Sequence, residues 1–182
     1  MIYTCDTFIN NIHTMKFIQT LTEMFTQRGY FEIKETHEFT NFLQVLTNDK
    51  EKVYVFANFI EKISVNLFKE CLAFLEQNNS THCIIITSEG ITPCVKKIID
   101  NSYNIRIEVF SEDELGYNVT KHCLVPKHEL ATSEELAELK KHLPNLPIIL
   151  HKDPVIRFLG YEKKQVVKIT RKSGAIVFRI II

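Results

Sequence analysis

The feature that most constrains the fold is an alternation of strand-like and helix-like segments over the first 110 residues. Residues 53–59, 82–88 and 105–110 are short apolar runs rich in β-branched and aromatic side chains, which favour strands. Residues 64–77 and 92–102 lie between these runs and have the pattern of helices. Strands that alternate with helices in this way predict an α/β layer with a largely parallel sheet.

The N-terminal segments extend this pattern. A helix is predicted at roughly 6–28, where apolar residues recur near helical spacing and Gly29 is placed to end the helix. A strand is predicted at 30–33. Four apolar residues at i, i+3, i+4 and i+7 then predict a short helix: Phe39, Phe42, Leu43 and Leu46. We expect residues 1–116 to form an α/β domain with a four-stranded, largely parallel or mixed sheet and flanking helices.

The C-terminal region is organised differently. Residues 118–130 look extended, with Pro126 interrupting the strand. Residues 165–171 and 175–182 predict two strands joined by a short, glycine-bearing hairpin turn. We therefore expect residues 117–182 to form a small α+β domain that ends in a β-hairpin.

Two short helices are predicted within this second domain. Thr132 followed by Glu135 is a capping box, which opens a helix to about residue 142. In the second helix Asp153 can cap, Pro154 fits the first helical position and Gly160 ends the turn. Three apolar residues share one face of this helix: Val155, Phe158 and Leu159.

The formal net charge is zero, but the charge is unevenly distributed. Residues 1–117 hold 10 Lys and Arg against 16 Asp and Glu, whereas residues 118–182 hold 12 against 6. Two interpretations stay open. The charges are solvated faces of unlike segments, or the basic part docks on nucleic acid or on an acidic protein surface.

Cysteine usage and hydropathy indicate an intracellular protein. No window of eighteen apolar residues is present, and Asp, Asn and His interrupt the N-terminal segment, so we expect a soluble protein that is not secreted. The five cysteines are widely spread without any CxxC pair: Cys5, Cys71, Cys83, Cys94 and Cys123. This distribution is typical of reduced thiols rather than of a disulfide framework or zinc ribbon.

Two groups of residues could bind a metal or act as a nucleophile, and each also has a purely structural explanation. His122, Cys123 and His128 are possible zinc ligands, but no fourth ligand stands in register, so we expect packing and hydrogen-bonding groups and neither metal nor cofactor. Cys94 follows a helix-start sequence, which can activate a thiol. No His and Asp accompany it, and we expect an ordinary buried cysteine.

A nuclease is the enzymatic alternative. Glu32 and Lys34 form an E-x-K element, which resembles that of metal-dependent nucleases with α/β cores. Two-metal chemistry needs convergent carboxylates, and only Glu108 lies on a later predicted strand. We therefore favour a chain without catalytic residues and keep a free-standing nuclease or DNA-binding module as the alternative.

One helix start has the chemistry of a phosphate site. Thr92 can cap, Pro93 occupies the first turn, and Lys96 and Lys97 follow. Backbone N–H groups, the helix dipole and two ammonium groups can converge there on a phosphate. The alternative is an ordinary solvated helix start.

The C-terminal region resembles the fifth subunit of eukaryotic nuclear RNA polymerases and the smaller archaeal homologue of that protein. The family pattern is roughly H-x-LVP-x-H, LP-x-I, DPV-x-R-x-x-G and VVKI-x-R-x-S, and this chain has HCLVPKHEL and later LPIILHKDPVIRFLGYEKKQVVKITRKSG. The resemblance spans nearly all of 118–182. Upstream it is thinner, with RGYF at 28–31 and ITPCVKK at 91–97 similar to stretches of the eukaryotic N-terminal jaw domain.

The sequence also departs from the family. Cys123 stands where the family usually has an acidic residue, and Lys164 stands where it has glycine. The hairpin loop at 171–174 and the jaw are shorter than in cellular versions, and loop shortening of this kind leaves the fold intact. With the richness in Ile, Asn, Lys and Phe, these departures suggest a divergent member, for which a large DNA virus is one source.

The resemblance implies a structural role in transcription. A jaw domain (1–116) is expected near downstream DNA, with weak, sequence-independent contacts through Thr92, Pro93, Lys96 and Lys97. An assembly domain (117–182) is expected to bind the largest polymerase subunit and the rest of the core, with Arg157 projecting toward the partner and no contact with membranes. The implied partner interface is Pro126, His128, Asp153, Pro154, Arg157, Gly160, Lys168 and Arg171.

The basic hairpin fits this role. Six cations are too many for a small sheet to bury, which favours an acidic docking surface: Lys163, Lys164, Lys168, Arg171, Lys172 and Arg179. The core face of the last strand is expected to be Ile176, Phe178, Ile180 and Ile182. We expect a nuclear location for a cellular member, and the host cytoplasm and virion for a member encoded by a cytoplasmic virus.

Overall fold

The computed structural model describes residues 12–30, 32–34, 42–47 and 52–182. The chain divides into two compact units, Met1–Tyr117 and Asn118–Ile182. Among the described residues, the helices are all too short or too polar to cross a lipid bilayer.

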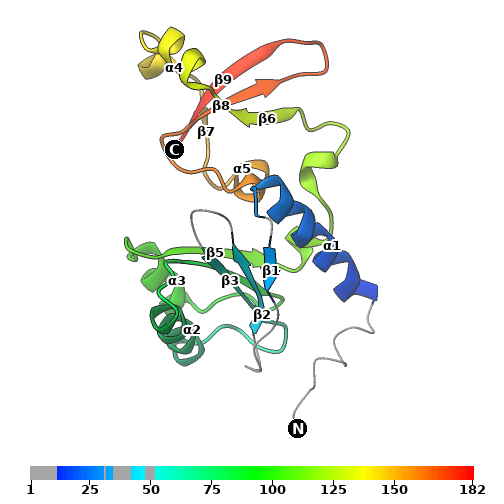
Figure 1. Cartoon of the computed structure of the whole chain (residues 1–182), viewed down its shortest axis with the longest axis vertical. Coiled ribbons are helices and arrows are strands. Elements are labelled where there is room, and N and C mark those ends of the chain that lie inside the picture. Colours follow the sequence, from blue (N-terminus) through cyan, green and yellow to red (C-terminus); the bar gives the residue numbers. More distant parts are fainter. Residues whose placement is uncertain (1–11, 31, 35–41, 48–51) are drawn as a thin grey trace. The chain divides into compact units, whose positions relative to one another are not determined.

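The first unit is built on a five-stranded mixed sheet (Figure 1). Its strand order follows the chain: β1 (Glu32–Lys34), β2 (Phe42–Thr47), β3 (Lys52–Asn58), β4 (His82–Thr87) and β5 (Arg106–Ser111). The first three strands are antiparallel, and β3, β4 and β5 are parallel. The parallel half carries the helices of the alternating pattern, α2 (Val65–Gln77) and α3 (Pro93–Asp100).

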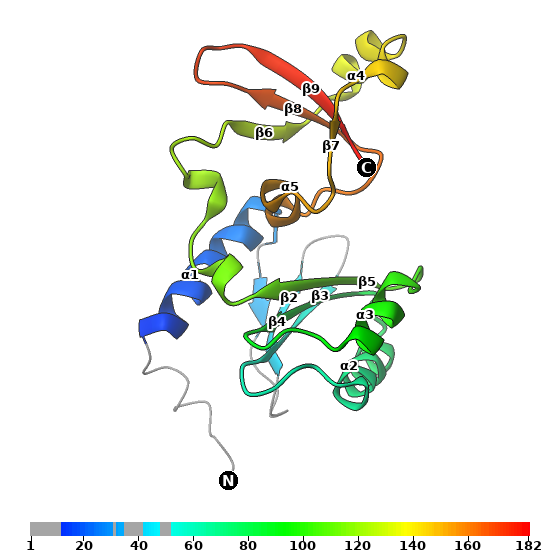
Figure 2. The same cartoon turned by 180° about the vertical axis from the view of Figure 1, so that it is seen from behind.

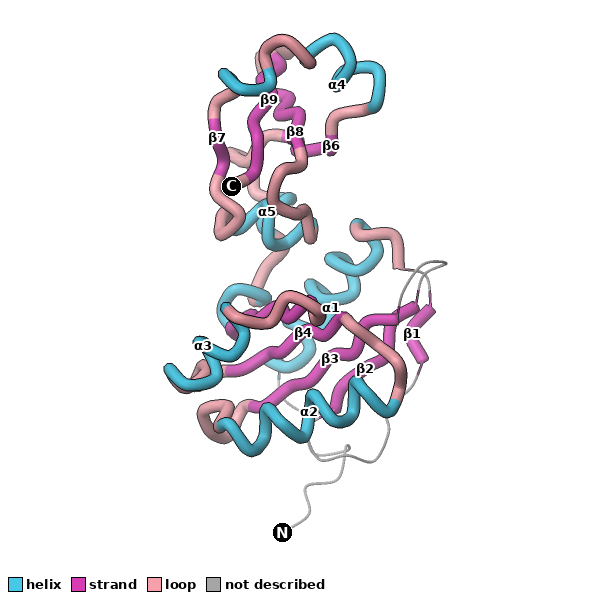
Figure 3. Tube along the Cα trace, turned by 90° about the vertical axis from the view of Figure 1, so that its left-hand side faces the viewer, coloured by secondary structure: helices cyan, strands magenta, loops and turns pink. Residues whose placement is uncertain are grey.

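Both faces of this sheet are covered. Helices α2 and α3 lie over one face, and α1 (Ile12–Gln27) lies over the other (Figures 1 and 3). Successive side chains of β3 and β4 therefore point alternately into the apolar core on one face of the sheet and into the core on the other face. Tyr54 and Ile85 belong to the core under α2, whereas their neighbours Val53 and Ile84 are fully buried without belonging to it. This explains why β3 and β4 are continuous apolar runs rather than alternating ones.

One predicted helix is wrong. Residues 42–46 belong to β2, and the remainder of the predicted segment, at 39–41, lies outside the described residues. A short apolar run fits either period, and here the edge of β3 supplies backbone partners that an isolated short helix would lack. The sheet consequently has five strands instead of four, and its N-terminal half is antiparallel.

The second unit is a four-stranded sheet with short helices (Figure 2). The strand order is β6 (Lys127–Leu130), β8 (Val166–Thr170), β9 (Ile176–Ile181) and β7 (Ile148–Ile149). Only β7 runs parallel to its neighbour. The predicted capping box is confirmed, because Thr132 and Glu135 cap α4 (Ser133–Leu139) reciprocally.

Short 3₁₀ turns fill several connections: η2 (Asp113–Leu115), η3 (Val119–Lys121) and η4 (Leu143–Asn145). The segment predicted to be extended from residue 118 is therefore a strand only after Pro126. The Asn118 side chain accepts a hydrogen bond from the Thr120 N–H, which stabilises the turn that replaces the strand.

Helix α5 (Pro154–Leu159) begins and ends as predicted. Oδ1 of Asp153 accepts hydrogen bonds from the N–H groups of Val155 (2.9 Å) and Ile156 (3.4 Å). Gly160 ends the helix in the left-handed conformation at φ 67°. Ile156, which was not part of the predicted apolar face, is fully buried and packs α5 against Val167 and Ile169 of the sheet.

The predicted core face of β9 is wrong. Val167 and Ile169 of β8 are buried, and the hairpin register places Arg179 and Val177 beside them. The inward residues of β9 are therefore the odd-numbered ones, with Ile181 in the core. The predicted residues lie on the other face, where Ile176 is 51% and Ile182 is 50% exposed. An all-apolar strand does not reveal by itself which alternate set is buried.

Candidate partner interface

The second unit contains a groove of about 660 Å³ that brings together half of the predicted interface. Its lining includes Pro126, His128, Asp153 and Arg171. These residues come from the segment before β6, from β6, from the start of α5 and from the end of β8. Residues far apart in the sequence therefore meet at one surface.

Apolar side chains form much of this lining. The strands contribute Ile149, Ile169 and Val177, and the helix contributes Val155. The segment before β6 adds Leu124, which is 82% exposed. A leucine held this far out of the core gains by burial against another molecule.

The polar lining is mainly cationic. Arg171, Lys172 and Arg179 line the groove, and Asp153 is the one carboxylate in this lining. That carboxylate already accepts the two N–H groups at the start of α5. One Arg179 guanidinium N–H donates to the carbonyl oxygen of Ile148 at 3.2 Å. Arg171 and Lys172 form no ion pair with any described residue.

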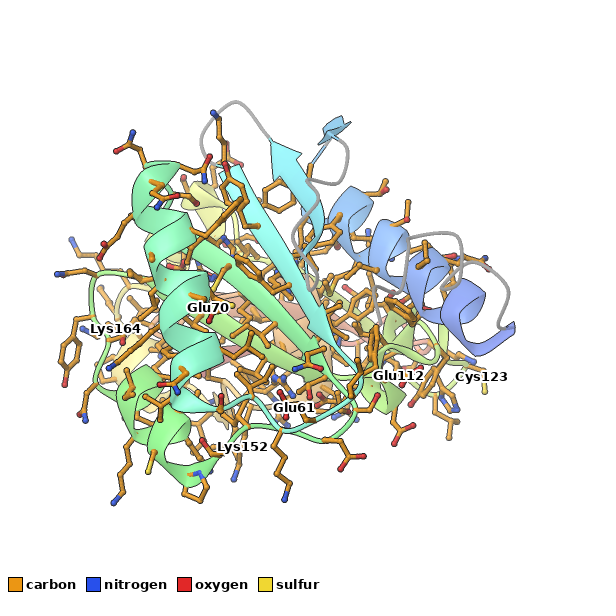
Figure 4. All side chains as sticks on the ribbon, turned by 90° about the horizontal axis from the view of Figure 1, so that it is seen from below. Glu61, Glu70, Glu112, Cys123, Lys152 and Lys164 are labelled. Atoms are coloured by element: carbon orange, nitrogen blue, oxygen red, sulfur yellow. The ribbon has the colours of Figure 1, made fainter. Side chains whose placement is uncertain are left out.

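His128 stabilises the start of β6 through a side-chain hydrogen bond to the backbone. Its Nδ1 lies 2.8 Å from the carbonyl oxygen of Pro126 and therefore donates to it. This bond leaves Nε2 as the other hydrogen-bonding atom of the ring. Cys123, labelled in Figure 4, is exposed and also lines the groove.

The remaining predicted interface residues do not line the groove. Pro154 is exposed at the start of α5, Gly160 ends that helix, and Arg157 is half-buried with partners inside the protein. Lys168 alternates with the inward residues of β8, so it lies on the opposite face of the sheet.

Lys168 also has a partner of its own. Its ammonium group donates to Oε1 of Glu135 at 2.5 Å. This hydrogen bond, together with the capping bond to Thr132, lowers the pKa of Glu135, and the same contact raises the pKa of Lys168. Lys168 thus holds α4 against the sheet.

The predicted DNA-proximal residues lie at the start of α3. Thr92 is the N-cap residue, but its side chain does not cap, which corrects the prediction. Its backbone N–H donates to the carbonyl oxygen of Ile63 at 3.2 Å, and its Oγ1 is buried without a hydrogen-bond partner among the described residues. Lys96 and Lys97 are exposed. Cys94 is exposed as well, contrary to the expectation that it is buried.

The first unit contains a buried ion cluster that was not predicted from the sequence. Both guanidinium ends of Arg28 bind the Glu108 carboxylate, at 3.0 and 2.8 Å. His82 Nε2 lies 2.9 Å and Arg106 lies 3.1 Å from Oε1 of the same carboxylate. Arg28 also lies over the ring of Phe110. The cluster therefore joins the end of α1 to β4 and β5.

The cluster fixes the ionisation of Glu108. Burial by itself raises the pKa of Glu108, but the positive charge of Arg28 and the hydrogen bond from His82 outweigh it, so the pKa lies well below its usual range. Both carboxylate oxygens are occupied by cationic or ring donors. Glu108 is therefore engaged in a structural contact rather than presented to a metal.

Other metal and thiol sites lack support in the described part of the chain. There, no group of three or more His, Cys, Asp or Glu side chains is arranged to hold a metal ion. Cys71 and Cys83 are buried in the core beneath α2, and burial raises the pKa of the Cys71 thiol to about 12. Such thiols remain protonated and unreactive at neutral pH.

The comparisons with known proteins agree with the sequence motifs. Residues 117–181 match the family model described as RNA polymerase Rpb5, C-terminal domain. The chain is 32% identical over 174 residues to the DNA-directed RNA polymerases I, II, and III subunit RPABC1 of Caenorhabditis briggsae, which covers 91% of this chain and 82% of the relative. This chain belongs to the Rpb5 family of RNA polymerase subunits.

Two further relatives carry the same subunit name. The Dictyostelium discoideum protein is 36% identical over 130 residues, covering 68% of this chain and 66% of the relative. The Caenorhabditis elegans protein is 36% identical over 141 residues, covering 72% and 67%. The similarity to these relatives thus extends into the first unit, beyond the region that the family model matches.

Proposed function

We propose that this chain is a structural, non-catalytic subunit of a multisubunit DNA-dependent RNA polymerase. Residues 118–182 dock on the largest subunit, and residues 1–117 form a jaw near downstream DNA. Membership of the Rpb5 family supports the role in transcription. The observation that carries the docking surface is the groove, which gathers Pro126, His128, Asp153 and Arg171 from segments far apart in the chain.

The electrostatics of the second unit support docking. Arg171 and Lys172 form no ion pair with described residues of the same chain, and they adjoin exposed apolar surface at Leu124. Unpaired cations beside exposed apolar side chains are typical of a surface that a partner completes.

The jaw role rests on less of the structure. Lys96 ends the first turn of the eight-residue helix α3 and Lys97 lies in its last turn. Both are exposed, and their long side chains can reach a phosphate bound at the helix start. The surrounding unit is acidic overall, and Glu61 and Glu112, labelled in Figure 4, follow β3 and β5. Contact with downstream DNA is therefore weak and independent of sequence.

The nuclease alternative is not favoured. Its second acid, Glu108, is engaged by Arg28, His82 and Arg106, so ligating a metal would require breaking a buried ion cluster. A single remaining acid, Glu32, does not provide the convergent carboxylates of two-metal hydrolysis.

Affinity purification of the tagged full chain from its native source tests the proposed function. We expect the two largest polymerase subunits to co-purify in amounts comparable to the chain. A chain that purifies without them and cleaves DNA with Mg²⁺, in a manner abolished by Glu32→Ala, would overturn the proposal. The identity of the native source also determines the expected location of the chain. This location is the nucleus for a cellular member, and the host cytoplasm and virion for a member from a cytoplasmic virus.

A further inference from the structure

We propose that the groove of the second unit binds an acidic segment of the largest polymerase subunit that also presents an apolar side chain. This inference rests on the proposed function and deepens it, because it names the chemistry that the docking surface recognises. The carboxylates of the segment pair with the groove cations, and its apolar side chain covers the strands between them.

The charge of the groove selects an acidic occupant. Arg171 and Lys172 are exposed and form no ion pair with described residues. Arg179 uses one donor on the Ile148 carbonyl, and its fork offers further N–H groups. The single acid of the lining, Asp153, forms no ion pair with a described residue, and its one negative charge against three cations leaves the groove positively charged.

The apolar lining selects a polypeptide over nucleic acid. Ile149, Ile169 and Val177 line the groove beside the cations, and Leu124 projects into solvent at its margin. Ile149 and Ile169 are already buried in the fold, so the accessible apolar surface is that of half-buried Val177 and of Leu124, which is 82% exposed. A phosphate backbone would satisfy the cations and leave Val177 and Leu124 uncovered. A peptide segment that alternates acidic and apolar side chains satisfies both parts of the lining. The groove volume, about 660 Å³, is that of an ordinary binding pocket.

Charge reversal tests the acidic occupant. The full chain is mixed with the purified largest subunit from the same source, at about 0.1 and about 0.3 M salt. Arg171→Glu/Lys172→Glu should weaken binding about tenfold or more at the lower salt, and the deficit should shrink at the higher salt. The matched control is Lys140→Glu/Lys141→Glu, which makes the same charge change at exposed sites of the same unit outside the groove. The control should bind like wild type.

Folding is separated from binding in the same experiment. Both reversed residues lie at the exposed hairpin turn, so the melting temperature of the double variant should equal that of the control. A neutral variant, Arg171→Gln/Lys172→Gln, should bind with intermediate affinity. Equal binding by wild type and all variants would overturn the inference while leaving the proposed function intact, whereas failure of wild type to bind would overturn the proposed function.

A crosslink identifies the occupant. Cys123 lines the groove, so a benzophenone maleimide attached there in the Cys5→Ser/Cys94→Ser variant reports on what lies in it. In the assembled polymerase we expect crosslinks to a segment of the largest subunit with at least two acidic residues and an apolar one. Crosslinks to DNA, to a basic segment, or to neither while assembly persists would each overturn the proposal.

Discussion

The two units use cations in opposite ways. In the first, Arg28 is 4% exposed and its guanidinium is paired with Glu108, so the charge is satisfied inside the fold. In the second, Arg171 and Lys172 lie at the surface without an ion pair among described residues. A buried pair makes a unit depend on its own partners, whereas an unpaired surface cation costs little in the free chain and becomes useful on binding. The contrast separates a contact that maintains the fold from cations that, in the proposed function, pair with a partner during assembly.

The largest expected effect comes from breaking the buried cluster. Glu108→Gln removes the negative charge and leaves Arg28, Arg106 and His82 around a neutral amide. We expect the free energy of unfolding of the first unit to fall by about 3–5 kcal/mol, measured by urea titration. Glu70→Gln, at an exposed position of α2, serves as the control and should change it by less than about 0.5 kcal/mol. A loss below about 1 kcal/mol for Glu108→Gln would show that the cluster is not a stabilising contact.

Acid should weaken the same cluster without mutation. The pKa of Glu108 is depressed in the folded state, so its stabilisation is complete above the unfolded value of about 4 and is lost as pH falls below it. The free energy of unfolding should therefore decline more steeply below about pH 4 in wild type than in Glu108→Gln. Parallel pH profiles for the two proteins would contradict this prediction.

Asp153 sharpens the comparison in the second unit, because it is the one acid in a cationic groove. Asp153→Ala removes the α5 cap and should lower the free energy of unfolding by about 1 kcal/mol. Asp153→Asn keeps a capping oxygen and should lose less than half as much. Both are measured by thermal unfolding of the full chain. An equal loss for the two variants would mean that the charge rather than the hydrogen bond stabilises the helix.

Substitutions of Lys164 test whether this surface cation lowers the stability of the second unit. Its φ of 72° lies in the left-handed region that favours glycine. Lys164→Gly should raise the melting temperature, corresponding to about 0.5–1 kcal/mol. Lys164→Ala removes the charge but keeps the strain, so it should show no gain. A gain with Ala would attribute the effect to charge.

The smallest expected effect is at the start of α3. In the assembled polymerase, Lys96→Ala/Lys97→Ala should reduce crosslinking to downstream DNA a few-fold, with a deficit that shrinks as salt rises because fewer counterions are released. Lys62→Ala/Lys69→Ala, at two other exposed positions of the same unit, is the matched control. A double variant that matches wild type in crosslinking and salt response would identify α3 as an ordinary solvated helix.

Local signals were predictable from the sequence, and long-range ones were not. The caps of α4 and α5 lie within a few residues of what they stabilise, so Thr132, Asp153 and Gly160 could be assigned from spacing alone. The Arg28–Glu108 pair joins residues 80 positions apart. The sequence analysis noted RGYF at 28–31 only as a stretch similar to the family, which gives no indication that Arg28 pairs with Glu108.

The errors have the same origin. An all-apolar run such as 175–182 fixes a strand but not its inward face, because the register with β8 decides which alternate residues are buried. The segment that became β2 needed the edge of β3 to choose between a helix and a strand. The groove is assembled from four stretches of the chain, so the motifs identified some of its residues but not their common surface.

The position of β9 has a consequence for protein synthesis. This strand lies between β8 and β7 in the sheet, yet it follows both in the chain. Until residues 176–181 leave the ribosome, β7 has no neighbour to pair with and Val167 has no Arg179 beside it. A message cut short before this point yields a first unit that can fold and a second unit that cannot, so incomplete chains are left with exposed apolar strands and become targets for degradation before they reach a polymerase.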